Sequence, residues 1–422
     1  NIALYMLYYL ITFTILLYSR IYFKRVFISG TEHIPKDQPV FLASNHSNGF
    51  IDGTMVSALI FPKSTRIFVR GDVFGKGWAN FILRSLKLIP IYRARDGDAR
   101  TNRDGNNKSF DQLYAEFKKN RIVLIFPEAD AQIEKRLRPL KKGMARMIID
   151  MQSRGDKDME VAVVPFGLNY THYKRHRNEL MISFSKPVYL KDYLKEDGSE
   201  REAYNALTTD VGERIKKEMV DVNIGDDEVT ETALRIVRSE RRVPIMKFWV
   251  GSKARLQAEI DTANKIKFSN PDSNLRTVLT RYQNALDGSN TSEVGSRSVK
   301  LWEYTFWLIF IIPSSLSWLI TRWGLFFGKR LVDAKVKKDE LYESIYFGVG
   351  LAYNWILMLV GYPLCALFFG WWGIVGWFIF RWLSIPYQHC REIMAHFAAR
   401  KAWKKNADEL DTLRGEVLAE LF

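Results

Sequence analysis

The sequence predicts an α/β protein: a mostly parallel sheet flanked by helices, with an added helical region and hydrophobic membrane helices. Its 422 residues are enough for two or three domains. Short apolar strands alternate with helical patterns over residues 29–192, a pattern typical of a parallel sheet. A charged region of helical periodicity follows over residues 193–298. Uncharged runs, each long enough to meet a bilayer, lie at residues 2–19, 304–321 and 345–380.

The α/β region, residues 29–192, contains six apolar segments with the length of buried strands. They are VFLAS (40–44), RIFVR (66–70), KLIPIY (87–92), RIVLIF (121–126), VAVVPFGL (161–168) and LMISFS (180–185). Helical patterns lie between them at residues 106–120 and 141–153. A sheet built this way gathers the loops that follow its parallel strands at one edge.

The first apolar run predicts that residues 1–28 form an N-terminal membrane anchor helix. Residues 2–19 carry no charge, and Arg20, Lys24 and Arg25 follow directly. The run is marginal in length for a membrane span and ample for a helix lying in the headgroup layer. A buried core helix is the alternative interpretation.

Residues 299–386 are predicted to be embedded in a membrane. The run at 345–380 is too long for one span and is interrupted at residues 361–363 (Gly-Tyr-Pro), which predicts a hairpin with both ends on one side. The run at 304–321 contains Pro313-Ser314-Ser315, so we expect it to be kinked or re-entrant. The segment 387–422 is predicted to be a charged amphipathic helix.

Basic residues predict which side of the membrane holds the α/β region. Lys337, Lys338, Arg381 and Arg391 flank the long run. Because cytoplasmic loops carry an excess of Lys and Arg, we expect a membrane protein whose catalytic domain lies on the cytoplasmic side.

The composition favours an anionic partner. Lys and Arg number 62 against 47 Asp and Glu, for a formal charge of +15, and aromatic residues make up 14% of the chain with 12 Trp. Such aromatics favour a lipid bilayer over nucleic acid, because they lie in the apolar runs and are not interleaved with basic residues. Two cysteines, Cys365 and Cys390, are too few for a disulfide framework or a Cys-based zinc site. The sequence leaves the oligomeric state open.

The stretch FLASNHSNGFIDGTMV (41–56) places His46 after a strand and Asp52 in the helix that follows, with five residues between them. An imidazole takes a proton from a hydroxyl near pH 7, and does so best when a carboxylate holds its other nitrogen. The alternative is an exposed histidine, with Asp52 merely capping the helix. A metal site is less well supported, because the chain has only six His and none lies close enough to complete a ligand set.

Three further groups end strands or begin helices. Arg93 and Arg95 follow the strand at 87–92 and suit a phosphate, or are solvated charges. Glu128 follows the strand at 121–126, where it can accept substrate hydroxyls, pin a neighbouring arginine, or be an ordinary loop acid. Lys141 and Lys142 stand at a helix start, where an anion would relieve the conflict with the helix dipole, or are solvated.

Four blocks, NHSNGFID, LIPIYR, IFPEAD and VVPFGLNY, occur in the order and approximate spacing of the glycerolipid acyltransferase family, and the chain resembles that family over roughly residues 35–190. The family acylates glycerol 3-phosphate, dihydroxyacetone phosphate and 1-acylglycerol 3-phosphate. The pattern is nearest to the fungal glycerol-3-phosphate and dihydroxyacetone-phosphate acyltransferases, which also place five residues between His and Asp. Asn169 and Tyr170, in the last block, are candidates for ligand contact.

The resemblance implies that His46 is the general base and Asp52 its orienting partner. Arg93 would bind the acceptor's phosphate with help from Lys141, and Glu128 would hold its glycerol end. No metal or cofactor is implied, and acyl-CoA or acyl-ACP would be the co-substrate. The predicted substrate-binding set is Asn48, Arg93, Glu128 and Lys141.

The implied function is transfer of a fatty acyl group to the hydroxyl of glycerol 3-phosphate or dihydroxyacetone phosphate, the first step of phospholipid synthesis. The family usually has Gly and then a small residue or Thr after the glutamate, whereas this chain has Ala129-Asp130. The acceptor could therefore be 1-acylglycerol 3-phosphate or another lipid headgroup. Two rivals from other classes are a membrane-bound phosphatase or esterase and a non-enzymatic basic membrane scaffold.

Overall fold

The computed structural model describes residues 2–74, 78–92, 99–153, 159–194, 199–244 and 247–422. The chain forms two compact units. Unit 1 comprises Asn1–Met219, Phe248–Lys253 and Lys338–Ser344, and unit 2 comprises Val220–Lys247, Ala254–Lys337 and Ile345–Phe422. Unit 1 thus extends beyond the predicted α/β region 29–192 at both ends and gains two short segments from far along the chain.

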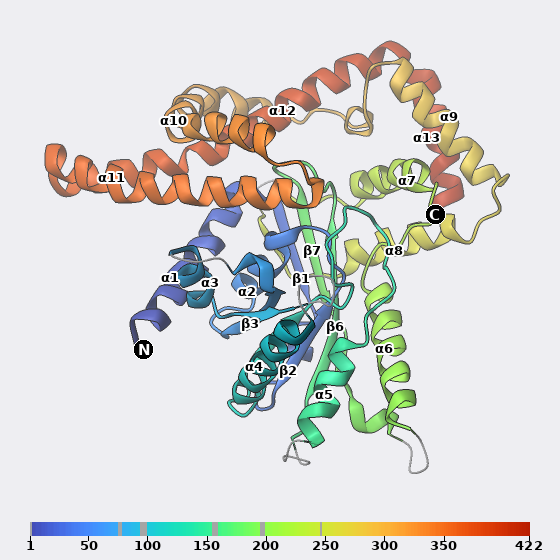
Figure 1. Ribbon diagram of the computed structural model, residues 1–422. Helices are drawn as coiled ribbons and strands as arrows, with labels where there is room; N and C mark the ends of the chain where they lie inside the picture. Colours follow the sequence, from blue (N-terminus) through green and yellow to red (C-terminus); the bar gives the residue numbers. More distant parts are fainter. Residues whose placement is uncertain (1, 75–77, 93–98, 154–158, 195–198, 245–246) are drawn as a thin grey trace. The chain divides into compact units, whose positions relative to one another are not determined.

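Unit 1 is built on a mixed, mostly parallel sheet in the order β4-β3-β5-β2-β6-β7-β1-β9, with β8 paired to β6 (Figure 1). All six predicted strands are present. The sequence did not indicate β1, which runs on from an apolar helix, or β8 and β9, which have two residues each. The strands are β1 (Arg25–Ser29), β2 (Val40–Ser44), β3 (Thr65–Arg70), β4 (Leu88–Ile91), β5 (Ile122–Ile125), β6 (Ala162–Tyr170), β7 (Glu179–Phe184), β8 (Val188–Tyr189) and β9 (Trp249–Val250).

The register brings the ends of three central strands together. Strand β2 pairs in parallel with β5 on one side and β6 on the other, with Ala43 opposite Ile125 and Ser44 opposite Phe166. The chain therefore leaves β2 and β5 at the same edge of the sheet, and β6 ends there as well. Ligands of open α/β sheets bind at this edge.

Helices cover both faces of the sheet (Figure 1). In β5, Val123 and Ile125 lie in the core shared with α4, α5 and α6, while Leu124 points to the other face, against Gly53 of α2. Because both faces of β5 are buried, its sequence is a continuous apolar run. The helices of unit 1 are α1 (Ile2–Tyr22), α2 (Gly49–Leu59), α3 (Trp78–Ser85), α4 (Ala99–Phe117), α5 (Gly143–Ser153) and α6 (Glu200–Lys217).

The apolar helix α1 packs onto unit 1 along one side. Tyr8 is buried, and its hydroxyl lies 3.3 Å from the Thr65 hydroxyl and accepts the Thr65 N–H at 3.1 Å. The opposite side exposes Met6, Leu10 and Phe13. The segment is therefore a docked helix with an apolar outer stripe, and its role as a membrane anchor stays a prediction.

Unit 2 is helical and has its own core, in which α7, α9 and α13 pack around the buried Trp403. The predicted C-terminal helix 387–422 is divided in two by a 3-10 turn at Lys404–Asn406, since Leu410, Leu413 and Val417 turn α13 onto α9. The helices are α7 (Asp227–Glu240), α8 (Ala254–Lys267), α9 (Asn274–Gly288), α10 (Leu301–Lys335), α11 (Asp339–Trp382), α12 (Ser384–Trp403) and α13 (Ala407–Leu421). The first six residues of α11, 339–344, belong to unit 1.

Helix α11 is a hairpin, as predicted, but its turn lies at Gly370 and not at residues 361–363 (Figure 1). Gly370 has φ 59° and ψ −147°, a conformation that essentially only glycine adopts. The arms approach closely, since a Cβ placed on Gly373 would lie 2.0 Å from the Cys365 carbonyl oxygen. Pro363 stays inside the first arm, because a proline removes one N–H without reversing the chain.

Helix α10 continues through Pro313 without a break, so the chain does not reverse there as a re-entrant segment would, and a kink at the proline stays a prediction. Ser314 and Ser315 donate their hydroxyls to the carbonyls of Phe310 and Ile312 within the same helix. Within the described residues, two stretches are long and apolar enough to cross a membrane: α10, and the run that starts with α11. Their most apolar windows are only 17% and 6% buried.

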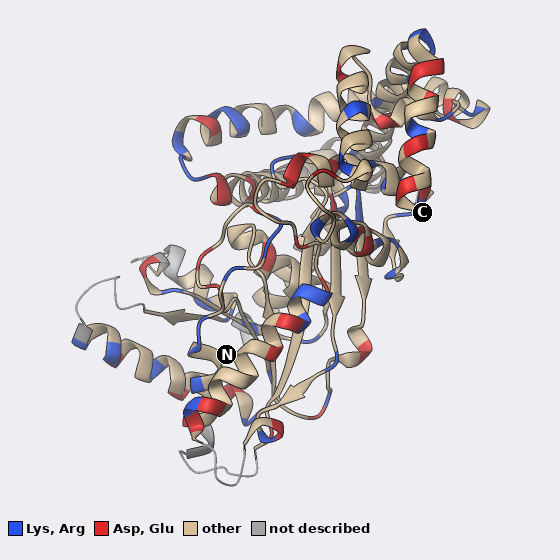
Figure 2. Cartoon of the chain, turned by 90° about the vertical axis from the view of Figure 1, so that its right-hand side faces the viewer, with Lys and Arg blue, Asp and Glu red and all other residues tan. Residues whose placement is uncertain are grey.

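Charged residues of both signs are interspersed along the helices in Figure 2. Many of them pair within one unit, as do Arg214 and Asp210 at 2.7 Å on α6 of unit 1. In unit 2, Arg238 of α7 pairs with the fully buried Glu259 of α8 at 2.9 Å. Many charged side chains therefore form local ion pairs, and these leave the net positive charge of the chain unchanged.

Candidate active site

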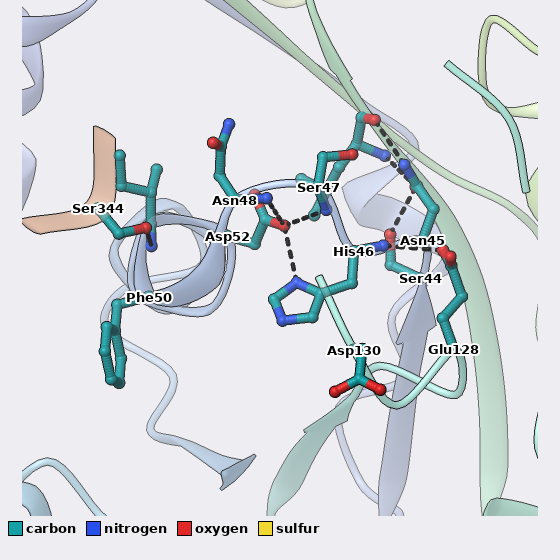
Figure 3. Close-up of polar contacts among 12 residues, drawn as sticks. Ser44, Asn45, His46, Ser47, Asn48, Phe50, Asp52, Glu128, Asp130 and Ser344 are labelled. Atoms are coloured by element: carbon teal, nitrogen blue, oxygen red, sulfur yellow. Dashed lines mark hydrogen bonds and ion pairs between the residues drawn. The ribbon is translucent and has the colours of Figure 1, made fainter. Parts of the chain in front are cut away.

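The imidazole of His46 and the carboxylate of Asp52 form a direct pair. Strand β2 ends at Ser44, and the loop that follows carries His46 to the start of α2, where Asp52 lies in the first turn. His46 Nδ1 lies 2.9 Å from Asp52 Oδ2 (Figure 3). A carboxylate accepts and does not donate, so Nδ1 carries a hydrogen, and Nε2 is the nitrogen that can accept a proton when the imidazole is neutral.

Backbone groups hold Asp52 in place. Its Oδ2 also accepts the N–H groups of Ser47 and Asn48, at 2.8 and 2.9 Å. The side chain is fully buried, and the positive end of the α2 dipole favours a carboxylate there. Asp52 therefore caps its own helix and orients the imidazole at the same time, so the two interpretations of this aspartate are compatible.

The second oxygen of Asp52 accepts the hydroxyl of Tyr170, at 2.6 Å from the last residue of β6. Tyr170 is buried, and burial together with the nearby Asp52 carboxylate raises its pKa well above the usual range. The phenol therefore stays protonated and remains a donor. Both oxygens of the carboxylate are fixed, one by α2 and its loop and the other by the sheet.

The imidazole ring is held from one face and open at its far nitrogen. It stacks on Phe126 with ring centres 4.0 Å apart and planes inclined by 11°. The His46 side chain is 15% exposed, whereas its partner Asp52 is inaccessible. Among the residues that the structure describes, Nε2 has no hydrogen-bond partner, and in Figure 3 it points away from Asp52. A substrate hydroxyl could reach this nitrogen.

Glu128 follows β5 and holds the backbone of the histidine loop. Its Oε1 accepts the N–H of His46 at 2.9 Å, and its Oε2 accepts Nε of Arg138 at 2.6 Å. Burial raises the pKa of Glu128, while Arg138 and the His46 N–H act in the opposite direction. Because both carboxylate oxygens are bound by the protein, Glu128 acts as a brace between β5, the histidine loop and Arg138.

The loop after β5 makes further contacts with Arg138 and the histidine loop. Arg138 also donates to the carbonyl of Asp130, and the Gln132 N–H donates to the His46 carbonyl at 3.1 Å. Ala129 lies between these contacts with φ 72°, in the left-handed region that favours glycine. The structure thus gives a reason for the glycine that the resembling family usually has after the glutamate.

Part of the chain is similar to known acyltransferases. Residues 25–169 match the protein-family model described as Acyltransferase, a range that includes His46, Asp52 and Glu128. This range of the chain is therefore a domain of the acyltransferase type. Two Saccharomyces cerevisiae proteins, glycerol-3-phosphate O-acyltransferases 2 and 1, are 27% and 25% identical to it over 143 and 139 residues.

The alignments to the two yeast proteins cover a minority of each chain. Each alignment covers 33% of this chain and 18% of the yeast protein, so the match spans under a fifth of those relatives' length. Among solved structures, the 1-acyl-sn-glycerophosphate acyltransferase PlsC from Thermotoga maritima is 16% identical, with a TM-score of 0.32. That match covers 45% of this chain and 71% of PlsC.

The acyltransferase domain brings together three of the residues predicted for the site: His46, Asp52 and Glu128. Asn48 is the N-cap residue of α2 and is buried; its backbone N–H binds Asp52, and its predicted contact with substrate stays a prediction. Lys141 is exposed beside the end of β5, where its N–H donates to the Pro127 carbonyl at 2.7 Å. Arg93 and Arg95 lie outside the described residues.

The sequence did not predict the contacts that Tyr170 and Arg138 make in this network. Tyr170 was a candidate for ligand contact, and the structure shows it bound to Asp52. Arg138 is the arginine that Glu128 holds, one of the three interpretations offered for that acid. The signal for Tyr170 was its place at the end of a buried strand, whereas Arg138 had none beyond its position in a basic loop.

Proposed function

We propose that the protein is an O-acyltransferase that moves a fatty acyl group from an acyl thioester, acyl-CoA or acyl-ACP, to a hydroxyl of glycerol 3-phosphate or dihydroxyacetone phosphate. The observation that carries the proposal is the His46–Asp52 pair, held at 2.9 Å with Nε2 directed away. The yeast relatives, which are named as glycerol-3-phosphate O-acyltransferases, support this choice of acceptor.

In the proposed reaction, His46 is the general base. Nε2 takes the proton of the acceptor hydroxyl as its oxygen attacks the thioester carbonyl, and the Asp52 carboxylate stabilises the imidazolium that forms. The tetrahedral intermediate then breaks its C–S bond, and the thiolate leaves and receives the proton from the imidazolium. No nucleophile from the protein is needed, because the acceptor itself attacks.

The acceptor's phosphate is proposed to bind to cationic groups at the same edge of the sheet. Arg93 follows β4 in the sequence, Lys141 lies beside the end of β5, and Arg138 is braced next to the histidine loop. The Asp130 carboxylate lies near the imidazole in Figure 3, so these cations must offset it where a dianion binds. Arginine suits this task because its planar group grips phosphate at two points.

A membrane location is proposed from the helices of unit 2. The tip of the α11 hairpin exposes Leu367, Phe368, Trp371 and Trp372, each at least 70%. Exposed apolar surface of this kind is typical of a lipid-facing segment. The basic residues around the hairpin support a cytoplasmic side for the acyltransferase domain, where acyl-CoA or acyl-ACP would be available.

Product analysis tests the proposal. The full chain in lipid vesicles is offered one labelled acyl-CoA together with glycerol 3-phosphate, dihydroxyacetone phosphate or 1-acylglycerol 3-phosphate, and products are identified by mass spectrometry. We expect a monoacylated glycerol phosphate or its keto analogue from the wild type and none from His46→Ala. A wild type that releases only free fatty acid would contradict the proposal and favour a hydrolase.

The same assay tests the phosphate site. Arg93→Ala should raise the acceptor KM by about tenfold or more, because a charge-assisted pair is lost, with a smaller effect on kcat. Lys142→Ala, beside the proposed helper Lys141, is the matched control and should leave KM within about twofold. An unchanged acceptor KM in Arg93→Ala would contradict the assignment of the phosphate to this arginine.

A further inference from the structure

The N-terminal segment of α11, residues 339–344, caps the helix that carries Asp52, although 293 residues separate the two bonded groups in sequence. The N–H of Ile51 in α2 donates to Ser344 Oγ at 3.2 Å (Figure 3). Asn48 occupies the N-cap position of α2, but its side chain makes no capping bond. Ser344 therefore satisfies a buried N–H that the helix's own N-cap residue leaves free.

Close packing accompanies this bond. A Cβ added to Gly49, the first residue of α2, would lie 2.8 Å from Cδ2 of Leu341 and 3.4 Å from the Glu340 carbonyl oxygen. In the next turn of α11, Glu343 accepts the hydroxyl of Tyr22 from the end of α1. All of these residues belong to unit 1, so residues 339–344 are part of the same compact unit as the His46 site.

The bond acts on the turn of α2 that sets the imidazole. Ile51 precedes Asp52, whose Oδ2 is 2.9 Å from His46 Nδ1. A buried N–H left without an acceptor costs about 1–3 kcal/mol, so loss of the Ser344 hydroxyl would drive this turn to move until Ile51 finds another partner. Any such movement carries the Asp52 carboxylate with it and changes the direction in which it holds the ring.

We propose that the N-terminal segment of α11, residues 339–344, is a positioning element of the acyltransferase site, with Ser344 as its positioning residue. The inference rests on the proposed acyl transfer and extends it to a segment far from the matching range 25–169. Ser344 acts on the reaction through Ile51 and Asp52. The substrate meets His46 and the cationic groups, so the acceptor's affinity should not depend on Ser344.

The main test compares Ser344→Ala with Ser344→Thr, which keeps the hydroxyl. We expect kcat per folded molecule to fall about tenfold in Ser344→Ala, which corresponds to ~1.4 kcal/mol, with acceptor KM within about twofold, and to recover in Ser344→Thr. The control, Asp339→Asn, removes the exposed ion pair between the first residue of α11 and Lys174, and its kcat should stay within about twofold of the wild type. A wild-type kcat in folded Ser344→Ala would overturn the inference.

A second readout does not need turnover. Hydrogen exchange of peptides covering residues 45–56 reports opening of the α2 N-terminus, and it should be faster in Ser344→Ala than in the wild type, Ser344→Thr or Asp339→Asn. If the wild type transfers no acyl group, the proposed function fails while this exchange pattern still decides the positioning role. Equal exchange in all four proteins would contradict that role.

A packing pair covers the case in which Ser344→Ala does not fold. Gly49→Ala forces its new methyl group against Leu341 and should lower kcat, whereas Gly49→Ala with Leu341→Ala opens the space and should restore most of it. If the double variant is no more active than Gly49→Ala alone, the result would contradict a functional contact between α11 and α2.

Discussion

Two histidine–carboxylate pairs, one in each unit, have similar contacts and different surroundings. In unit 1, His46 Nδ1 lies 2.9 Å from Asp52, and Nε2 is directed away from the protein network. In unit 2, His396 Nδ1 lies 3.3 Å from Glu303, and its Nε2 lies 3.4 Å from the Arg297 carbonyl oxygen. The His46 side chain is 15% exposed, and that of His396 is 1% exposed.

The partner carboxylates differ in the same sense. Asp52 is surrounded by N–H and O–H donors and has no cation against it in the described part of the chain, so its charge acts on the imidazole. Glu303 forms an ion pair with Arg297, and the guanidinium offsets much of the negative charge of the carboxylate. A histidine beside an acid is therefore a catalytic candidate only when its second nitrogen is free and the acid is not already neutralised by a cation.

The largest difference between the pairs should appear when the orienting acid is changed. Asp52→Asn places an amide against Nδ1 and favours the tautomer with its hydrogen on Nε2, which cannot accept a proton from substrate. We expect kcat to fall about 10²–10⁴-fold, the range of general-base catalysis, with acceptor KM little changed. Steady-state kinetics on protein of verified fold measures this, and a loss below about threefold would mean that Asp52 does not orient the base.

A smaller effect should follow removal of the hydroxyl that fixes the second oxygen of Asp52. Tyr170→Phe keeps the ring packed in β6 but leaves a buried carboxylate oxygen without its donor. We expect stability to fall by about 1–3 kcal/mol and kcat by about tenfold, because Asp52 is less firmly held. Thermal unfolding and kcat are measured together, and wild-type values for both would show that the sheet side of the carboxylate has no role.

The smallest effect on activity is expected in the pair of unit 2. His396→Gln should leave kcat per folded molecule within about twofold and lower stability by about 1–3 kcal/mol, since buried polar groups lose a partner. Kinetics and thermal unfolding of the same preparation measure the two effects. A large loss of kcat at full stability would remove the contrast between the two histidines.

The same variant has a pH signature. Burial, followed by the Arg297 charge, lowers the pKa of His396 below its ordinary value of 6.5, against the opposing effect of Glu303. As the pH falls, His396 is therefore protonated in the unfolded chain before it is protonated in the folded chain. The stability of the wild type should fall as the pH drops below about 6.5. His396→Gln lacks this proton uptake, and its melting temperature should decline less over the same range. A steeper decline in the variant would contradict the assignment.

The sequence was sufficient to predict six of the strands and the contact between His46 and Asp52, because these depend on local pattern. Runs such as the one ending at Ile125 are apolar on both faces, and His46 and Asp52 lie close enough in sequence for one loop and one helical turn to join them. The contacts that hold this pair in place could not be predicted from the sequence. Tyr170 and Ser344 meet α2 only through the sheet register and a distant helix, at separations that follow no spacing rule.

The hairpin shows the same division between composition and geometry. An apolar run with internal glycines and a proline predicts a reversal of the chain, and the reversal is present in α11. The position of the turn depends on which residue adopts a positive φ angle, and the run contains several glycines that could do so. The structure selects Gly370, where the two arms can pack closely on either side, whereas Pro363 is accommodated within a helix.

The central claim is that the free nitrogen of His46 is the base for acyl transfer, and a paired measurement tests it most directly. Acyl transfer from labelled acyl-CoA to glycerol 3-phosphate is compared in His46→Ala and His396→Ala, each normalised to folded protein. The account predicts a loss of about 10²-fold or more in the first and at most about twofold in the second. A His46→Ala protein that keeps wild-type turnover would contradict it.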